Sequence, residues 1–255
     1  AAGSGFRIPF LLENLTDRNF VYDELIWNPS EDSAGLLLSV DDDFWYTWRQ
    51  YFDMFDVYGA KLTFFVQGAP DSLDKNMSLT EFCREAVKRG HDIGFHTTNH
   101  LNLPKVSRDT FNTETIYGAH VFRGAGISFS AFAFPYGLSE PWMRETLSPV
   151  FRITRGYGTN IRFYNSQTAK SGYIVSIAID NIIYPDDQKF ESVVFFLLFA
   201  AKFTGNSFIP LTTHDFSDTV QWGIKPGRMD YLLRTAQRLK LKFYTYADVQ
   251  RLISE

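Results

Sequence analysis

Residues 35–66 read GLLLSVDDDFWYTWRQYFDMFDVYGAKLTFFV, and this stretch decides the fold. It begins with an apolar run from Gly35 to Val40, interrupted only by Ser39, which predicts a buried strand. A helical pattern follows, with aromatic side chains at three- and four-residue steps: Trp45, Trp48, Phe52 and Phe55. Residues 61–66 then predict a second strand. A buried strand, a helix and another strand together indicate one unit of a parallel α/β fold.

The same alternation continues along the chain. Further strands are predicted at 91–95, 128–134, 151–154, 173–179, 208–213 and 242–244. Further helices are predicted at 80–89, 107–122, 142–147, 191–203, 229–239 and 246–253. Strand and helix alternate about seven times, without a long linker or a change of composition. This pattern favours one α/β domain with a parallel, barrel-like sheet over two small domains.

Composition narrows the class of protein. The net charge is −4, which disfavours nucleic acid as a partner because phosphate binding needs a basic surface. Cys83 is the only cysteine, so an internal disulfide is excluded. The longest apolar run, residues 193–201, is far shorter than the roughly 20 residues that span a bilayer, so no membrane span is expected. The sequence shows no signal segment. Residues 1–33 are predicted to be an N-terminal extension that packs on the barrel.

Polar side chains follow several of the predicted strands: Asp41, Asp42, His96, Tyr136, Asp180 and His214. In parallel barrels the loops at the carboxyl ends of the strands build the active site. His96 and His100 are four residues apart, so both imidazoles can grip one ion. Two histidines and a carboxylate are a common ligand set for catalytic zinc. Each residue alone also has a plain structural explanation, such as a solvated turn or a loop cap, and only their conjunction favours a site.

Five segments resemble the motifs of the polysaccharide deacetylases of the NodB-homology type, carbohydrate esterase family 4. They are 38–42 (LSVDD), 59–68 (GAKLTFFVQG), 90–100 (GHDIGFHTTNH), 133–137 (AFPYG) and 211–214 (LTTH). The segments occur in the family's order, and the histidine segment is the most specific of them. The resemblance implies a distorted, incomplete (β/α) barrel of about seven strands, with residues 34–255 as the catalytic domain.

The resemblance also implies a metal centre and a base. Asp42, His96 and His100 would hold a divalent metal, expected to be zinc. Asp41 would be the general base that takes a proton from the attacking water.

Three further residues receive roles from the same resemblance. His214 would be the general acid that protonates the leaving group. Asp180 would orient this histidine and keep it charged, although the aspartate–tryptophan pair that usually follows in the family is absent. The backbone N–H of Tyr136 would help to hold the oxyanion.

The chain departs from the family at two places. The triple aspartate allows the pair to be Asp41 with Asp42 or Asp42 with Asp43; we favour the first, because Asp43 then falls where the family usually has glycine. Ala133 stands where the family usually has an arginine that contacts the base. We predict that Arg155 supplies this contact, the alternative being that Arg155 is a surface residue.

These features predict a metal-dependent hydrolase that removes acetyl groups from a polysaccharide or oligosaccharide. The expected reaction is de-N-acetylation of N-acetylglucosamine-type units in peptidoglycan, a chitin-like glycan or an exopolysaccharide. Two alternatives stay open: an O-acetyl esterase acting on a xylan-like glycan, and a non-catalytic glycan-binding relative. Such substrates predict an extracytoplasmic location, in the periplasm, secreted or on the cell surface.

Overall fold

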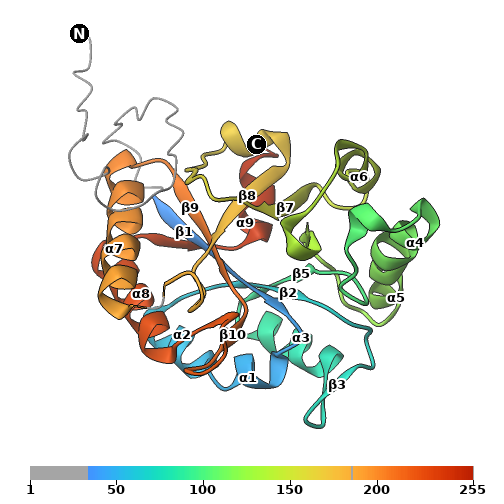
Figure 1. Ribbon diagram of the computed structural model, residues 1–255, viewed down its shortest axis with the longest axis horizontal. Coiled ribbons are helices and arrows are strands. Elements are labelled where there is room, and N and C mark those ends of the chain that lie inside the picture. Colours follow the sequence, from blue (N-terminus) through green and yellow to red (C-terminus); the bar gives the residue numbers. More distant parts are fainter. Residues whose placement is uncertain (1–33, 185, 255) are drawn as a thin grey trace.

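Seven parallel strands form a closed ring at the centre of the molecule (Figure 1). The computed structural model describes residues 34–184 and 186–254, so the predicted extension at 1–33 lies outside the described residues. The strands of the ring are β1 (Gly35–Asp42), β2 (Thr63–Val66), β5 (Asp92–Phe95), β6 (Ala131–Ala133), β7 (Ile153–Tyr157), β8 (Tyr173–Ala178) and β9 (Phe208–Thr213). Pairing of β9 with β1 closes the ring. The predicted barrel of about seven strands is thus confirmed.

Strand β1 closes the ring, because it pairs with strands on both of its edges. Its residues 35–40 pair with β9 on one edge, and residues 39–42 pair with β2 on the other. The short strand β12 (Lys242–Tyr244) pairs with residues 35–37, at the start of β1 and ahead of the residues that pair with β2. All but the last residue of β1 are buried, which explains its nearly continuous apolar sequence. The ring is distorted because some pairings are short: β5 and β6 share the single pair Phe95 and Phe132.

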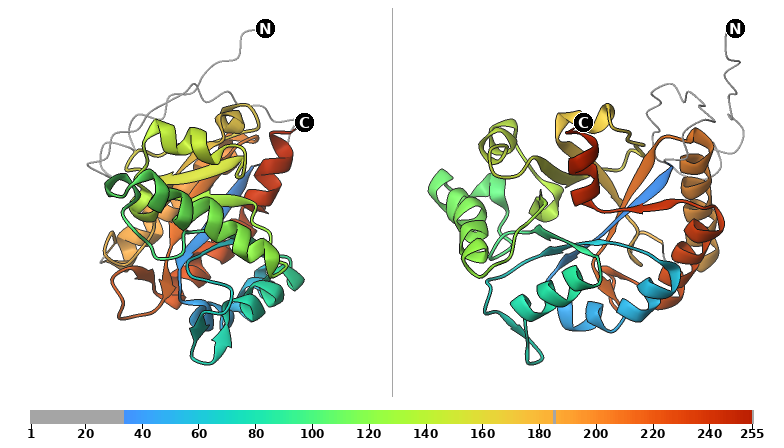
Figure 2. Two further views of the ribbon diagram at one scale, coloured as in Figure 1. Left: turned by 90° about the vertical axis from the view of Figure 1, so that its right-hand side faces the viewer. Right: turned by 180° about the vertical axis from the view of Figure 1, so that it is seen from behind.

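Helices surround the ring, and α7 and α8 pack together on one flank (Figure 2). The helices are α1 (Trp45–Arg49), α2 (Phe52–Tyr58), α3 (Leu79–Lys88), α4 (Arg108–Asn112), α5 (Gly118–Gly124), α6 (Pro141–Leu147), α7 (Asp187–Thr204), α8 (Pro226–Arg238) and α9 (Tyr246–Leu252). Two short sheets complete the fold: β3 (Leu73–Asp74) with β4 (Met77–Ser78), and β10 (Asp215–Phe216) with β11 (Gly223–Ile224). In the described part of the chain, no helix is long and apolar enough to cross a membrane.

The helices bury an aromatic layer against the outside of the ring. The rings of Trp48, Phe52 and Phe82 all contact Phe64 of β2, with centroids 5.2 to 5.9 Å apart. Aromatic pairs at this spacing add to the energy of apolar burial. Many of the 25 phenylalanines in the sequence therefore build the core.

Two predicted helices are interrupted. The aromatic pattern after the aspartates forms α1 and α2, separated by a turn in which the Gln50 N–H donates to the Thr47 carbonyl. The predicted helix 107–122 consists of α4, a π-helical turn at Thr113–Tyr117, and α5. A π-turn inserts one residue without breaking the helical run, so apolar periodicity does not reveal it.

Candidate active site

Three predicted ligands converge at the carboxyl ends of β1 and β5. Asp42 is the last residue of β1, His96 directly follows β5, and His100 lies in the loop beyond. The Nε2 atoms of both histidines lie 3.4 Å from Asp42 Oδ1. One ligand atom from each of the three residues lies within 4.8 Å of the other two. This spacing suits three ligands around one ion.

The chemistry of these side chains also fits a divalent metal. His96 Nδ1 lies 2.9 Å from the carbonyl oxygen of Ala133, so Nδ1 carries the proton and Nε2 offers its lone pair. Burial, helped by the nearby His96, lowers the pKa of His100 to about 4. Burial raises the pKa of Asp42, but His96 and the other imidazoles outweigh it and lower the pKa to about 2. Neutral imidazoles and an ionised carboxylate are the states that bind metal. Among the described residues, the buried Asp42 Oδ1 accepts no hydrogen bond.

The backbone around these ligands is strained. Asp42, Thr97 and His100 have φ angles of 92°, 72° and 52°, in the region that favours glycine. Hydrogen bonds hold this conformation: the Gln67 N–H donates to the Asp42 carbonyl at 3.0 Å, and the Gly68 N–H to the Thr97 carbonyl at 3.1 Å. The His100 N–H donates to Thr97 Oγ1 at 3.0 Å. Such strain gathers at functional sites and persists only where the surroundings enforce it.

Asp41, the predicted base, is fully buried and held by two donors from β7. Arg155 Nη2 and the Tyr157 hydroxyl both donate to Asp41 Oδ2. Arg155 is fully buried, and its guanidinium lies 5.1 Å from the Phe65 ring centroid. The alternative that Arg155 is a surface residue is therefore wrong. In the register of β6 and β7, Arg155 is the direct partner of Ala133. The guanidinium reaches Asp41 from β7, the strand next to the one that carries Ala133.

His214 follows β9 and forms a pair with Asp180, which follows β8. His214 Nδ1 lies 3.1 Å from Asp180 Oδ2, while Asp180 Oδ1 accepts from the Thr213 hydroxyl at 2.8 Å. Burial lowers the pKa of His214, but the hydrogen bond and charge of Asp180 outweigh it and raise the pKa to about 9. The imidazole is therefore protonated at neutral pH, with Nε2 carrying a proton. The indole of Trp48 donates to the His214 carbonyl at 2.9 Å and fixes the backbone.

Tyr157 is the residue that sequence reasoning missed. Besides contacting Asp41, its hydroxyl lies 3.3 Å from His214 Nε2, so it links the predicted base to the predicted acid. Tyr157 stands two residues after Arg155, and alternate residues of a strand share a face. This spacing is the signal that the sequence contained.

Tyr136, the last predicted site residue, lies at the same end of the ring as the three ligands. Tyr136 adopts a left-handed conformation, with φ 58°, in the turn after β6. Its ring lies 4.7 Å from that of His100 and is half-exposed. The structure thus places Asp42 with the histidines and Asp41 with Arg155, in agreement with the favoured register of the triple aspartate. The third aspartate, Asp43, is exposed.

Residues 30–148 match the model of the polysaccharide deacetylase family. A curated relative is a peptidoglycan-N-acetylglucosamine deacetylase of Bacillus cereus, 27% identical over 145 residues that make up 56% of each chain. The chain therefore spans about half the length of this relative.

Solved structures share the fold. The chitin deacetylase of the fungus Colletotrichum lindemuthianum superposes with a TM-score of 0.60 at 17% identity, covering 88% of this chain and 90% of that one. The Xyl-CE4 domain of a multidomain xylanase, from the hindgut metagenome of Trinervitermes trinervoides, gives 0.59 at 16% identity, covering 85% and 89%. The whole barrel, beyond the segment matched by the family, therefore has the same architecture.

Proposed function

We propose that the protein is a zinc-dependent deacetylase that removes acetyl groups from N-acetylglucosamine-type units of a polysaccharide. The observation that carries this proposal is that two groups of residues converge at one end of the barrel. One is the ligand set of Asp42, His96 and His100. The other is the hydrogen-bonded line from Asp41 through Tyr157 to His214. Together they provide the parts that hydrolysis of an acetamide requires.

The three ligands would hold the ion, which when bound supplies a Lewis acid that polarises the acetyl carbonyl and acidifies water. The carboxylate of Asp41 accepts the proton of the attacking water through its free oxygen. Its other oxygen is fixed by Arg155 and Tyr157, so the base is held in one orientation. Burial lowers the pKa of Arg155, but the adjacent Asp41 carboxylate raises it above its usual range, so the guanidinium stays charged.

His214 then gives its proton to the departing amine as the carbon–nitrogen bond breaks. Asp180 makes this possible because it keeps the imidazole charged and holds Nδ1, which leaves Nε2 for the amine. The backbone N–H of Tyr136 contributes to stabilising the oxyanion. Water has then lost one proton to Asp41, and the amine has gained one from His214.

The substrate class rests on the relatives. The curated relative is named for peptidoglycan N-acetylglucosamine, which supports an amide as the bond cleaved and an envelope glycan as partner. An acetylated polysaccharide of this kind supports an extracytoplasmic location, in the periplasm, secreted or on the cell surface. The net charge of −4 disfavours nucleic acid as a partner, because phosphate binding needs a basic surface.

The test is acetate release from chitooligosaccharides, peptidoglycan fragments and acetylated xylan, with added zinc and with chelator. We expect zinc-dependent release from the first two, and its loss in Asp41→Asn. Release from xylan alone would favour the O-acetyl esterase. Protein that binds zinc yet releases no acetate from any of the three substrates would favour the glycan-binding relative and refute the proposed activity.

A further inference from the structure

The segment between the two histidine ligands is held from outside the active site. Thr97 and His100 both have positive φ angles, and a β-branched threonine rarely adopts them. Such strained conformations persist only where the surrounding structure enforces them. The His100 N–H bond to Thr97 Oγ1 lies within the segment, so it shapes the turn without anchoring it. Anchors come from other elements, and the Gly68 N–H that donates to the Thr97 carbonyl is one of them.

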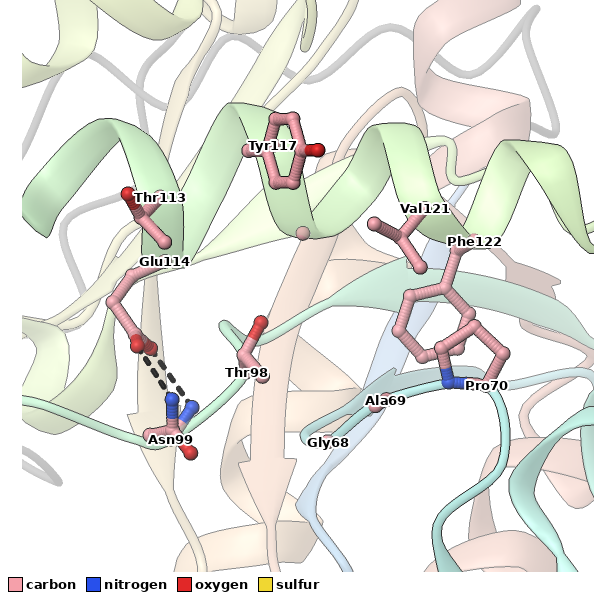
Figure 3. A pocket seen from close by; sticks show the side chains of 11 residues that line it. Gly68, Ala69, Pro70, Thr98, Asn99, Thr113, Glu114, Tyr117, Val121 and Phe122 are labelled. Carbon is pink, nitrogen blue, oxygen red and sulfur yellow. Dashed lines mark hydrogen bonds between the residues drawn. The ribbon is translucent and has the colours of Figure 1, made fainter.

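Glu114 provides a second anchor, at the residue next to His100 (Figure 3). Its carboxylate accepts two hydrogen bonds from Asn99: one from the backbone N–H at 2.8 Å and one from the side-chain amide at 2.6 Å. Glu114 is 4% exposed, whereas Asn99 is exposed, so a buried side chain holds an exposed one. Charge-assisted hydrogen bonds of this kind are about twice as strong as neutral ones. The residue that precedes His100 is therefore clamped at both its backbone and its side chain.

The helix that carries Glu114 is itself pressed against the same segment. Glu114 lies in the π-turn between α4 and α5, and Gly118 begins α5 one turn later. A Cβ atom at Gly118 would lie 2.7 Å from Thr98 Oγ1 and 2.8 Å from the Phe95 ring. Glycine is thus required for this close approach. π-turns in helices frequently mark functional sites.

We propose that Glu114 is a positioning residue for the metal centre: through Asn99 it holds the strained turn that aims His100 at the ion. This inference rests on the proposed metal site and adds a residue outside the family motifs that carry it. Groups that orient metal ligands from outside the site typically change metal affinity by roughly 10- to 100-fold when they are altered.

The test is the zinc affinity of Glu114→Gln, measured by competition with a chromophoric chelator on folded protein. Glutamine keeps the shape but has one acceptor oxygen, so its NH₂ group faces one of the two Asn99 donors. We expect zinc binding at least about 10-fold weaker. Asn99→Ala should weaken binding less, because the backbone N–H of residue 99 still donates. The double variant should bind no more than about 2-fold weaker than Glu114→Gln, since both changes remove one interaction.

Glu145→Gln is the matched control, because Glu145 is an exposed glutamate on α6 and the charge change is the same. It should bind zinc like the wild type. A merely structural role of Glu114 would lower the melting temperature of metal-free protein and leave zinc affinity within about 2-fold of the wild type. That result overturns the inference. If Glu114→Gln fails to fold, unchanged zinc affinity in Asn99→Ala overturns it instead. Wild-type protein that binds no zinc would refute the metal site itself, and the inference with it.

Discussion

Replacing Asp180 with asparagine should move the alkaline limit of activity to lower pH. The Asp180 carboxylate is the main group that raises the pKa of His214 to about 9, against the lowering effect of burial. Asparagine keeps an oxygen that accepts from the Thr213 hydroxyl and from the backbone N–H of His214, so the backbone geometry is retained. What is lost beside His214 Nδ1 is the negative charge and the accepting oxygen, because the amide NH₂ group takes the place of Asp180 Oδ2. The pKa of His214 should therefore fall towards its ordinary value of 6.5.

The size of the effect depends on pH. At pH 8, about nine-tenths of His214 is protonated with a pKa of about 9, but only about 3% with a pKa of 6.5, so acid-dependent turnover falls by up to about 30-fold. At pH 6 the imidazole is mostly protonated in both proteins, so their protonation-dependent rates differ by less than about 2-fold. General damage to the site lacks this pH dependence.

The assay is a pH profile of acetate release at saturating substrate for wild type and Asp180→Asn. Thr213→Val is the matched control, because it removes a hydrogen bond from Asp180 but keeps the charge. An alkaline limit that stays near pH 9 in Asp180→Asn would refute the assignment of His214 as the acid tuned by Asp180.

Stability has a linked signature. Because the folded-state pKa of His214 is raised above 6.5, its contribution to stability is complete below about pH 6.5 and is lost as pH rises through about 9. Urea unfolding of the wild type should show this loss between these pH values, and Asp180→Asn should show much less of it.

Three other perturbations separate the parts of the site. Arg155→Met should destabilise the fold by about 3–5 kcal/mol, since it leaves the buried Asp41 carboxylate without its cation, and adding Asp41→Asn should restore most of this loss; additive losses in urea unfolding would contradict the pairing. Tyr157→Phe should lower turnover by roughly 10- to 100-fold, the value of about 1.5–3 kcal/mol for a hydrogen bond to a charged group, with zinc affinity unchanged in equilibrium dialysis. Weaker zinc binding in that variant would show that the hydroxyl acts on the metal site instead. Zinc at about 100 times its Kd should stabilise the protein by about 2.7 kcal/mol, and a His100→Ala variant that keeps this rise in melting temperature would exclude the ligand assignment.

The placement of the site was predictable because parallel strands impose it. Every strand of a parallel ring ends at the same rim, so residues that directly follow buried strands meet there whatever their distance in sequence. Asp42, His96 and His214 were identified in this way. The histidine spacing added the metal, because a single turn brings two imidazoles together.

Contacts between side chains on different strands could not be predicted from the sequence. Whether Arg155 contacts Asp41 depends on the register of β6 and β7 and on the curvature of the ring, which no local pattern encodes. Tyr157 was hidden for another reason: a tyrosine in a strand is ordinarily a packing residue, and its hydroxyl gains meaning only from its neighbours. The π-turn at Thr113–Tyr117 was hidden by an apolar periodicity close to that of a regular helix.

The pairing of Ala133 with Arg155 bears on how inactive members of a family are recognised. Neighbouring strands lie about 4.8 Å apart, so a long side chain on either partner can deliver its charge to the same point in space. An alanine and an arginine can therefore exchange strands while the guanidinium keeps its place beside the base. A position-by-position comparison of sequences registers this exchange as the loss of an essential residue. Sorting enzymes from degenerate relatives in this family thus calls for asking where a charge arrives, rather than which column of an alignment contains it.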